Sequence, residues 1–259
     1  MRYAIISDIH SNIEALTTVL DALSRQSVDE ILCCGDIVGY YSNPNECIEL
    51  LSARGIRTIM GNHDITAAGI RDMESWYVAE RAIEWTRAQL TPANREILEQ
   101  LPRTLVVDNN FLLFHGALHP EQNPEDLHLV EEKDIENSMK ALTKHQAGIR
   151  LSFFGHTHRV AVYQYLHNRL TSVENQELVL DRDAWYMINP GSIGQPRDND
   201  ARASYLIYDA DERKITFHRQ AYDVSACRRK ARQQGLMPDS FLKRFAKRVY
   251  RKLGRIIGE

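Results

Sequence analysis

Short apolar runs alternate with segments of helical periodicity at the start of the chain, and this alternation limits the possible folds more than any other feature. Residues 3–7, 31–34 and 58–60 have the length and composition of buried strands. The segment after the first run has apolar residues on one helical face, namely Ile13, Leu16, Leu20 and Leu23. A strand–helix–strand–helix–strand order predicts a largely parallel sheet with helices packed outside it.

The second half of the chain is richer in strands. Apolar residues flank turn sequences at 106–114 and 203–219, and each pattern predicts a hairpin. Single strands are expected at 151–154 and 185–188, and a charged helix around 130–146. The pattern shows no internal repeat, so we predict one α/β domain.

Charge is divided unevenly along the 259 residues. The net charge is −3, but residues 225–259 contain eleven Lys and Arg against two acids, which is +9, and residues 1–224 carry −12. We therefore expect a catalytic domain over 1–224 and a basic, amphipathic helical tail over 225–259. An acidic domain surface argues against broad nucleic-acid binding, so a nucleic acid or an anionic membrane is a partner through the tail only. Packing of the tail on the body, substrate steering and dimerisation are the alternatives.

Cysteine usage and hydropathy bear on the compartment. The four cysteines form no Cys-x-x-Cys pair, and Cys33 and Cys34 lie in an apolar run typical of a buried strand. No apolar stretch reaches the roughly 18 residues that cross a bilayer, and Asp8 interrupts the first apolar run, unlike a signal peptide. We expect a reducing, cytoplasmic setting.

Potential metal ligands lie where the predicted strands end. Because strand ends of an α/β sheet converge on one crevice, side chains far apart in the sequence can meet there. Oxygen and nitrogen donors without thiolates favour Mn, Fe, Zn, Co or Ni over Ca or Mg. The candidates are Asp8, His10, Asp36, Asn62, His63, His115, His156 and His158. The other five histidines, including His128, have no assigned role.

The order of these residues resembles the calcineurin-like metallophosphoesterase superfamily. The motifs that carry the likeness are Asp8-x-His10, Gly35-Asp36, Gly61-Asn62-His63-Asp64, His115 and Gly155-His156-x-His158. Residues 35–47 and 189–197 are similar to the small bacterial and archaeal phosphodiesterase-like branch. The resemblance implies a four-layer αββα sandwich, with two mixed sheets face to face and helices outside.

The resemblance also implies a dinuclear centre and a mechanism. Its two divalent transition-metal ions, manganese first, would share Asp36. One ion would bind Asp8, His10, Asp36 and His158, and the other would bind Asp36, Asn62, His115 and His156. The reaction expected is hydrolysis of a small phosphoester, a diester or nucleotide-type ester, by a hydroxide held between the ions. His63 is expected to assist the leaving group, and Asp64 either orients the His63 ring and raises its pKa or caps a helix.

Two alternatives stay open on the same residues. One is a nuclease or nucleic-acid-associated phosphoesterase, since nucleases of this family share the metal set. The other is a non-catalytic scaffold of the same fold, although such proteins lose ligands. Residues 38–40 read Val-Gly-Tyr where the protein serine/threonine phosphatases and the symmetrical dinucleoside tetraphosphatases carry an arginine, which disfavours those two branches. The sequence leaves the physiological substrate and the oligomeric state open.

Overall fold

The structure is a computed structural model and describes residues 1–72, 77–118, 123–145 and 148–237. Its helices are α1 (Ile13–Leu23), α2 (Pro44–Ala53), α3 (Asn62–Ala68), α4 (Tyr77–Gln89), α5 (Pro92–Glu99), a 3₁₀ turn (Pro124–Asp126), α6 (Glu132–Thr143) and α7 (Val224–Gln233). One sheet has the order β3 (Arg57–Thr58), β2 (Glu30–Cys33), β1 (Arg2–Ile6), β11 (Ala203–Asp209), β12 (Lys214–Gln220) and β9 (Glu177–Val179). The other has the order β4 (Leu105–Val107), β5 (Phe111–Leu113), β6 (Leu151–Phe153), β10 (Trp185–Pro190), β7 (Val160–Leu166) and β8 (Arg169–Ser172).

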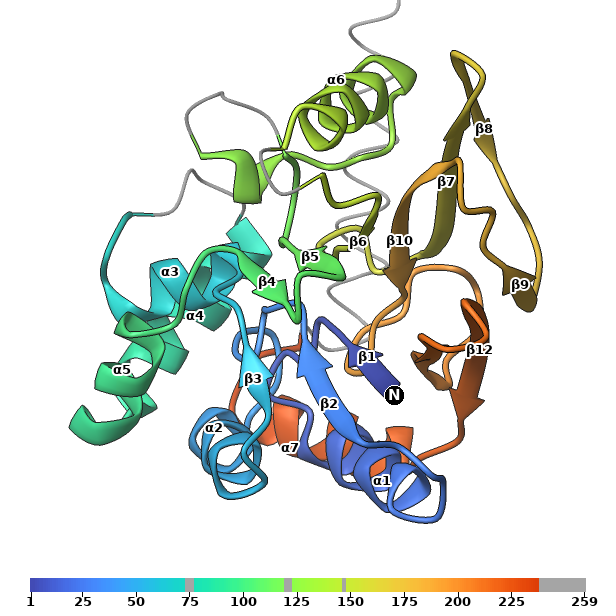
Figure 1. The fold of residues 1–259 in the computed structure, drawn as a ribbon. Coiled ribbons are helices and arrows are strands. Elements are labelled where there is room, and N and C mark those ends of the chain that lie inside the picture. The colour runs from blue at the N-terminus through green and yellow to red at the C-terminus, as the bar shows by residue number, and fades with distance from the viewer. Residues whose placement is uncertain (73–76, 119–122, 146–147, 238–259) are drawn as a thin grey trace, which may run out of the picture.

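The two sheets pack face to face with helices outside both. In Figure 1, α1, α2 and α7 lie beneath the first sheet and α6 lies above the second. Each sheet is mixed: β1, β2 and β3 are parallel in one, β5, β6 and β10 in the other, and antiparallel strands complete both. The four-layer α/β sandwich implied by the resemblance is therefore confirmed.

Strand β1 shows why the layers form. Its Tyr3 and Ile5 point into the core between the two sheets. Ala4 and Ile6 point into the core between the first sheet and helices α1 and α2. A strand alternates its side chains between two faces, so a continuous apolar run needs a hydrophobic layer on each side. The central strand β11 has the same arrangement.

The carboxyl ends of the parallel strands in both sheets meet at one edge of the sandwich. Hydrogen bonds join the loops that leave them: Gly155 N–H donates to the His115 carbonyl at 2.9 Å, and Ile193 N–H donates to the Ser7 carbonyl at 2.9 Å. The second bond connects a loop of one sheet with a strand end of the other. This edge holds the residues that the sequence singles out.

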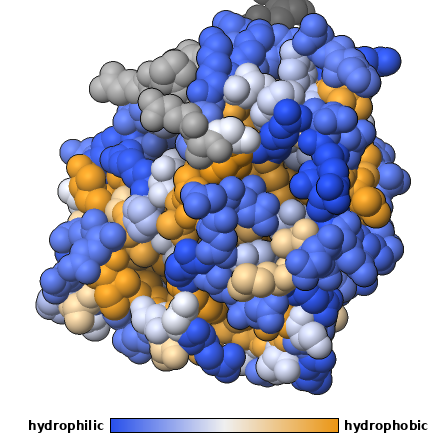
Figure 2. All heavy atoms as spheres, viewed as in Figure 1, coloured by the Kyte–Doolittle hydropathy of each residue, from blue (hydrophilic) through white to orange (hydrophobic). Residues whose placement is uncertain are grey.

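Hydrophilic residues cover much of the face seen in Figure 2, with hydrophobic residues showing between them. The large apolar side chains that are exposed among the described residues come from different parts of the fold, and they include Ile70, Val130 and Val179. No helix in the described ranges is long and apolar enough to cross a membrane.

Helix α7 lies within the segment predicted as a tail, but the structure packs it on the body. Cys227 and Ala231 are buried in a cluster with Tyr41 and Leu236. Asp223 caps the helix by accepting from Ala226 N–H at 2.9 Å. The packed body thus includes residues up to 237, beyond the predicted boundary at 224. Residues 238–259 lie outside the described residues, so the rest of the tail stays a prediction.

Truncation after Tyr222 should destabilise the fold, whereas truncation after Met237 should not. Removing α7 exposes Tyr41 and deletes three buried apolar side chains, which should lower the free energy of unfolding by roughly 2–4 kcal/mol. Thermal and urea unfolding of the full chain and both truncations would measure this. Equal stability of all three would show that α7 adds nothing to the core.

Candidate metal centre

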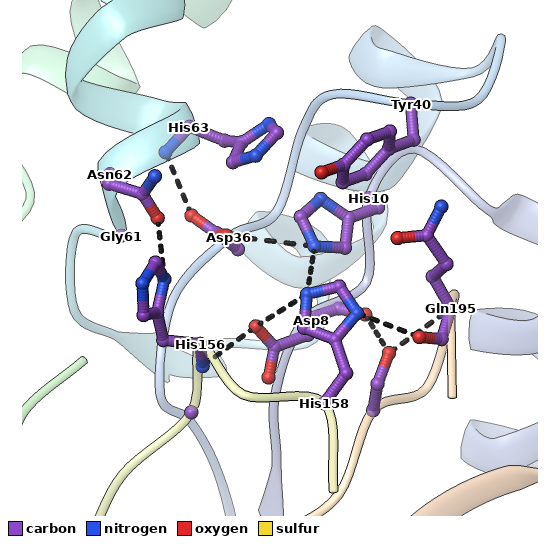
Figure 3. Close-up of polar contacts among 12 residues, drawn as sticks. Asp8, His10, Asp36, Tyr40, Gly61, Asn62, His63, His156, His158 and Gln195 are labelled. Carbon is purple, nitrogen blue, oxygen red and sulfur yellow. Dashed lines mark hydrogen bonds and ion pairs between the residues drawn. The ribbon is translucent and has the colours of Figure 1, made fainter. Parts of the chain in front are cut away.

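The predicted metal ligands come together at the shared edge of the two sheets. The loop after β1 supplies Asp8 and His10, and the loop after β2 supplies Asp36. Figure 3 shows the side chains pointing toward one another from these separate loops. Two groups of side chains have their ligand atoms within 4.8 Å of one another, namely Asp8, His10, Asp36 and His158, and Asp36, His115 and His156. All of these residues are buried.

Asn62, the first residue of α3, joins the second group. Its Oδ1 lies 3.0 Å from His156 Nδ1 and 3.2 Å from His115 Nε2. The structure therefore brings together all seven of the predicted ligands, and Asp36 belongs to both groups.

Each of the four imidazoles is held by a backbone carbonyl on one ring nitrogen. A carbonyl only accepts, so the nitrogen facing it must carry the proton. The donor is Nδ1 in three rings and Nε2 in His156. The pairs are His10 to Val38, His115 to Cys34, His158 to Gln195 and His156 to Asp126, at 3.1, 2.7, 2.7 and 3.1 Å. In its neutral form, each ring presents a lone pair on its other nitrogen, and that nitrogen faces the centre.

The two aspartates are each held by a backbone amide. Asp8 Oδ1 accepts from His156 N–H at 2.9 Å, and Asp36 Oδ1 accepts from His63 N–H at 2.9 Å. The second oxygen of each carboxylate is buried and has no hydrogen-bond donor among the described residues. In Asp36 the second oxygen, Oδ2, faces His10 and His115. In Asp8 the backbone-bound Oδ1 is also the oxygen near the centre, 3.5 Å from His158 Nε2, and Oδ2 lies on the side of Gly155.

Acceptor atoms consequently face acceptor atoms across the centre. His10 Nε2 lies 2.9 Å from His158 Nε2. Burial, together with the neighbouring cationic groups, holds the pKa of both rings well below the usual histidine value, so neither ring readily supplies a proton. Two lone pairs at this separation repel each other unless a cation lies within reach of both.

The centre attracts positive charge most strongly at His115. Burial disfavours charge on this ring, but the carboxylates of Asp36 and Asp8 outweigh burial and raise the pKa to about 10. His115 Nε2 lies 3.3 Å from Asp36 Oδ2. For Asp8, burial is the main cause that raises the pKa to about 7.

This donor set fits divalent cations. An uncompensated buried carboxylate costs several kcal/mol, and a domain has only about 5–15 kcal/mol of net stability. No Lys or Arg among the described residues forms an ion pair with Asp8 or Asp36. Imidazole nitrogens with carboxylate and amide oxygens suit Mn, Fe, Zn, Co or Ni, and two such ions would satisfy Asp36 Oδ2 and the facing lone pairs.

The loops that carry the ligands adopt unusual backbone conformations. Seven non-glycine residues here have positive φ, between 50° and 67°: Asp8, His10, Ser11, Asp36, Tyr40, His156 and His158. This left-handed region is unfavourable for L-residues and tends to gather at functional sites. Gly155 allows the close approach of two loops, since a Cβ there would lie 2.1 Å from Ser7 Oγ.

His63 lies beside the centre without belonging to either ligand group. Its ring lies 4.7 Å from the His10 ring and 4.8 Å from the Tyr40 ring, measured between centroids. Nδ1 is buried against Gly39 and has no hydrogen-bond partner among the described residues. A proton on Nε2 leaves Nδ1 as an unpaired acceptor, which is less costly than an unpaired buried N–H. Burial lowers the pKa of the ring, against the attraction of Asp36.

The prediction that Asp64 orients the His63 ring needs correction. Asp64 Oδ1 accepts from Val38 N–H at 3.1 Å, and Oδ2 accepts from Gly61 N–H at 3.0 Å. Asp64 therefore caps the start of α3 and holds the loop after β2, the alternative left open in the sequence. It does not raise the pKa of His63, because both of its oxygens bind backbone amides.

The structure adds residues that the sequence analysis left without a role. His128 Nδ1 lies 3.1 Å from His156 Nε2, with the two ring centroids 3.9 Å apart. His128 thus contacts the side of the His156 ring that faces away from the centre. No motif marks His128, because it lies on an irregular loop after the 3₁₀ turn. Arg197 belongs to the stretch 189–197 that the sequence marked, and its Nη2 donates to the Tyr40 hydroxyl at 3.2 Å.

Comparison with known proteins agrees with this geometry. A crystal structure of a metallophosphoesterase from Sphaerobacter thermophilus has a TM-score of 0.74 and 33% identity, and the match covers 95% of this chain and 98% of that one. The hypothetical protein PH1004 from Pyrococcus horikoshii OT3 shares the fold, with a TM-score of 0.72, 20% identity and coverage of 93% and 96%.

Sequence comparison extends the likeness. The uncharacterized protein MJ0912 of Methanocaldococcus jannaschii is 35% identical over 228 residues, which is 85% of this chain and 88% of the relative. Residues 1–213 match the calcineurin-like phosphoesterase superfamily domain. This chain, with its ligand-bearing loops at the shared edge of two sheets, belongs to the calcineurin-like phosphoesterase superfamily.

Proposed function

We propose that the protein is a dinuclear metal-dependent phosphoesterase that hydrolyses a phosphodiester or a nucleotide-type phosphoester. The observation that carries this proposal is the pair of buried ligand groups that share Asp36. A shared carboxylate offsets the repulsion between two cations and holds them close together, as two-metal hydrolysis requires. The family supports the reaction class, and the substrate within that class is our proposal.

Asp8, His10, Asp36 and His158 would hold one ion, and Asp36, Asn62, His115 and His156 the other, with manganese expected first. When bound, such ions supply a nucleophile from water at neutral pH and neutralise charge on the phosphoryl oxygens. The chain's own contribution is the orientation of the ligands. Each imidazole is fixed by a carbonyl and each carboxylate by an amide, so little rearrangement is needed on binding.

Replacing Asp36 by asparagine tests the shared ligand. We expect the wild-type protein loaded with Mn²⁺ to hydrolyse bis-p-nitrophenyl phosphate, a generic diester. In Asp36→Asn at least one ion should be lost, and kcat should fall by roughly 10²–10³-fold or more. Elemental analysis and steady-state kinetics measure the two effects, with Asp21→Asn, an exposed position on α1, as the matched control. Two fully occupied metal sites in Asp36→Asn would exclude a bridging role.

We propose that His63 donates a hydrogen bond or proton to the leaving oxygen. The His63 ring lies next to the His10 ring, and the His63 backbone N–H donates to Asp36 Oδ1. The predicted metal ligand Asp36 therefore positions His63, which is not itself one of the ligands. The tautomer argued above has its proton on Nε2. His63 would then act as a donor without a carboxylate partner on its ring.

A His63→Ala variant should retain its metal and lose rate according to the leaving group. For substrates with poor leaving groups, such as alkyl phosphates, kcat should fall by roughly 10²–10⁴-fold, the usual contribution of acid catalysis. The loss should be much smaller for p-nitrophenyl esters, whose leaving group needs no proton. His218→Gln, on β12 and stacked on Tyr205, is the control. Equal losses for both kinds of ester would contradict the donor role.

We further propose that the protein works in the cytoplasm and that its basic tail binds a polyanionic partner, a nucleic acid or an anionic membrane. All four cysteines are buried and free of disulfides, as suits a reducing compartment. Seven of the eleven basic residues of the tail follow Met237. Clustered Lys and Arg near an anionic surface contribute about 1 kcal/mol each.

The truncation after Met237 should separate the tail's binding from catalysis. It should elute from heparin at clearly lower salt than the full chain and lose binding to vesicles containing phosphatidylserine, because about seven cations are removed. Its kcat on small esters should equal that of the full chain. Unchanged heparin and vesicle binding would refute the role of the tail.

A further inference from the structure

Arg197 presents an exposed guanidinium beside Tyr40, and no carboxylate among the described residues neutralises it. We call this exposed side of the ligand cluster, at Tyr40 and Arg197, the mouth of the centre. Two other arginines of this part of the chain are paired with acids: Arg202 with Asp200 at 2.6 Å, and Arg219 with Asp198. Within the described ranges no acid lies in ion-pair distance of Arg197. Its hydrogen bonds run from Nη2 to the Tyr40 hydroxyl at 3.2 Å and to Gln195 Oε1 at 3.1 Å. Arg197 is exposed, and Nε and Nη1 remain as donors for a ligand.

Tyr40 connects this guanidinium with the ligand cluster. The Tyr40 ring lies beside the His10 and His63 rings, with centroids 4.7 and 4.8 Å away, and the Arg197 Cζ lies 5.9 Å from the Tyr40 centroid (Figure 3 shows Tyr40 above His10). Arg197 is thus one side chain removed from the residues that face the centre. Its charge also contributes to the low pKa of His10, His63 and His158.

The loop that carries Arg197 is built around a predicted metal ligand. Arg197 N–H donates to the His158 carbonyl at 3.1 Å, while the Gln195 carbonyl accepts from His158 Nδ1 at 2.7 Å. Ser192 Oγ donates to the Asp8 carbonyl at 2.8 Å and accepts from Gln195 N–H at 2.8 Å. The position of the Arg197 backbone is therefore set by the same contacts that position His158 and Asp8.

We propose that Arg197, steadied by Tyr40 and Gln195, binds the non-bridging phosphoryl oxygen that faces the mouth and so favours phosphomonoesters over diesters. The inference rests on the proposed phosphoesterase function and narrows it: of the two substrate classes named there, it selects nucleotide-type monoesters over diesters. A monoester has three non-bridging oxygens, so one remains for the mouth when two face the buried centre. In a diester the second ester group takes that place. A guanidinium, always charged and with several N–H donors in one plane, makes strong charge-assisted hydrogen bonds to a phosphoryl oxygen.

The test uses the full-length, Mn²⁺-loaded protein and its Arg197→Gln and Arg197→Lys variants. Inorganic phosphate, which keeps all the phosphoryl oxygens, is the binding probe and is titrated by calorimetry. Kinetics with p-nitrophenyl phosphate and bis-p-nitrophenyl phosphate give KM and kcat for a monoester and a diester. Arg202→Gln, an ion-paired arginine five residues away in sequence, is the matched control, and elemental analysis checks that metal content is unchanged.

In Arg197→Gln, phosphate affinity should fall and the monoester KM should rise by roughly 10–100-fold, the size of a lost charge-assisted hydrogen bond. The diester KM should change little. Arg197→Lys should recover part of the loss, because charge is kept and the fork is not. Tyr40→Phe should cause a smaller loss of the same kind.

Three results would overturn the inference: unchanged phosphate affinity in Arg197→Gln, equal losses for monoester and diester, or a loss that follows metal depletion. Failure of the proposed function has a different signature. A wild-type protein that hydrolyses no ester but binds phosphate in an Arg197-dependent way would refute the function and leave the phosphate contact intact.

Discussion

Acceptor atoms that converge in a buried space are the constraint on which the rest of this structure depends. Asp36 stands at the middle of them, fully buried, with one oxygen on a backbone amide and the other facing His10 and His115. Such an arrangement is unfavourable without positive charge, because a buried carboxylate costs several kcal/mol when its partners are weak. Cations bound at this point would offset the cost of burying these groups, and the contacts of the same groups would then stabilise the fold. The ligands, the loops and the rim are all organised around that requirement.

The sandwich provides what the centre needs, namely two sets of parallel strand ends at one edge. Hydrogen bonds such as Ile193 N–H to the Ser7 carbonyl tie the loops of one sheet to those of the other. The loops bend sharply, and Asp8 and His156 adopt left-handed backbone conformations. Burial and these cross-sheet bonds hold the strain. The site is therefore also the junction between the two sheets, which joins function to stability.

Around the buried acceptors lies an outer set of donors. His63 and Arg197 approach the centre from separate elements, and Tyr40 touches the side chains of both. The inner acceptors suit cations, and the outer donors suit the anionic oxygens of a ligand bound to such cations. Tyr40 lies close to the centre, and Arg197, which donates to its hydroxyl, lies on a loop more than 150 residues later in the chain.

The sequence by itself determined the alternation of strands and helices and the candidate ligands, whereas the two-sheet sandwich was implied by the family resemblance. The continuous apolar run of β1 requires a core on both faces, and Asp8 and His10 come just after that run ends. Local capping signals were ambiguous at Asp64, where a carboxylate after Asn-His suits either a catalytic or a capping role. Only the tertiary structure decided for the cap, since the amides of Gly61 and Val38 claim both oxygens. The contacts of His128, Arg197 and α7 were also decided only by the tertiary structure, because an irregular loop carries no periodic signal and an amphipathic helix does not specify the surface on which its apolar face packs.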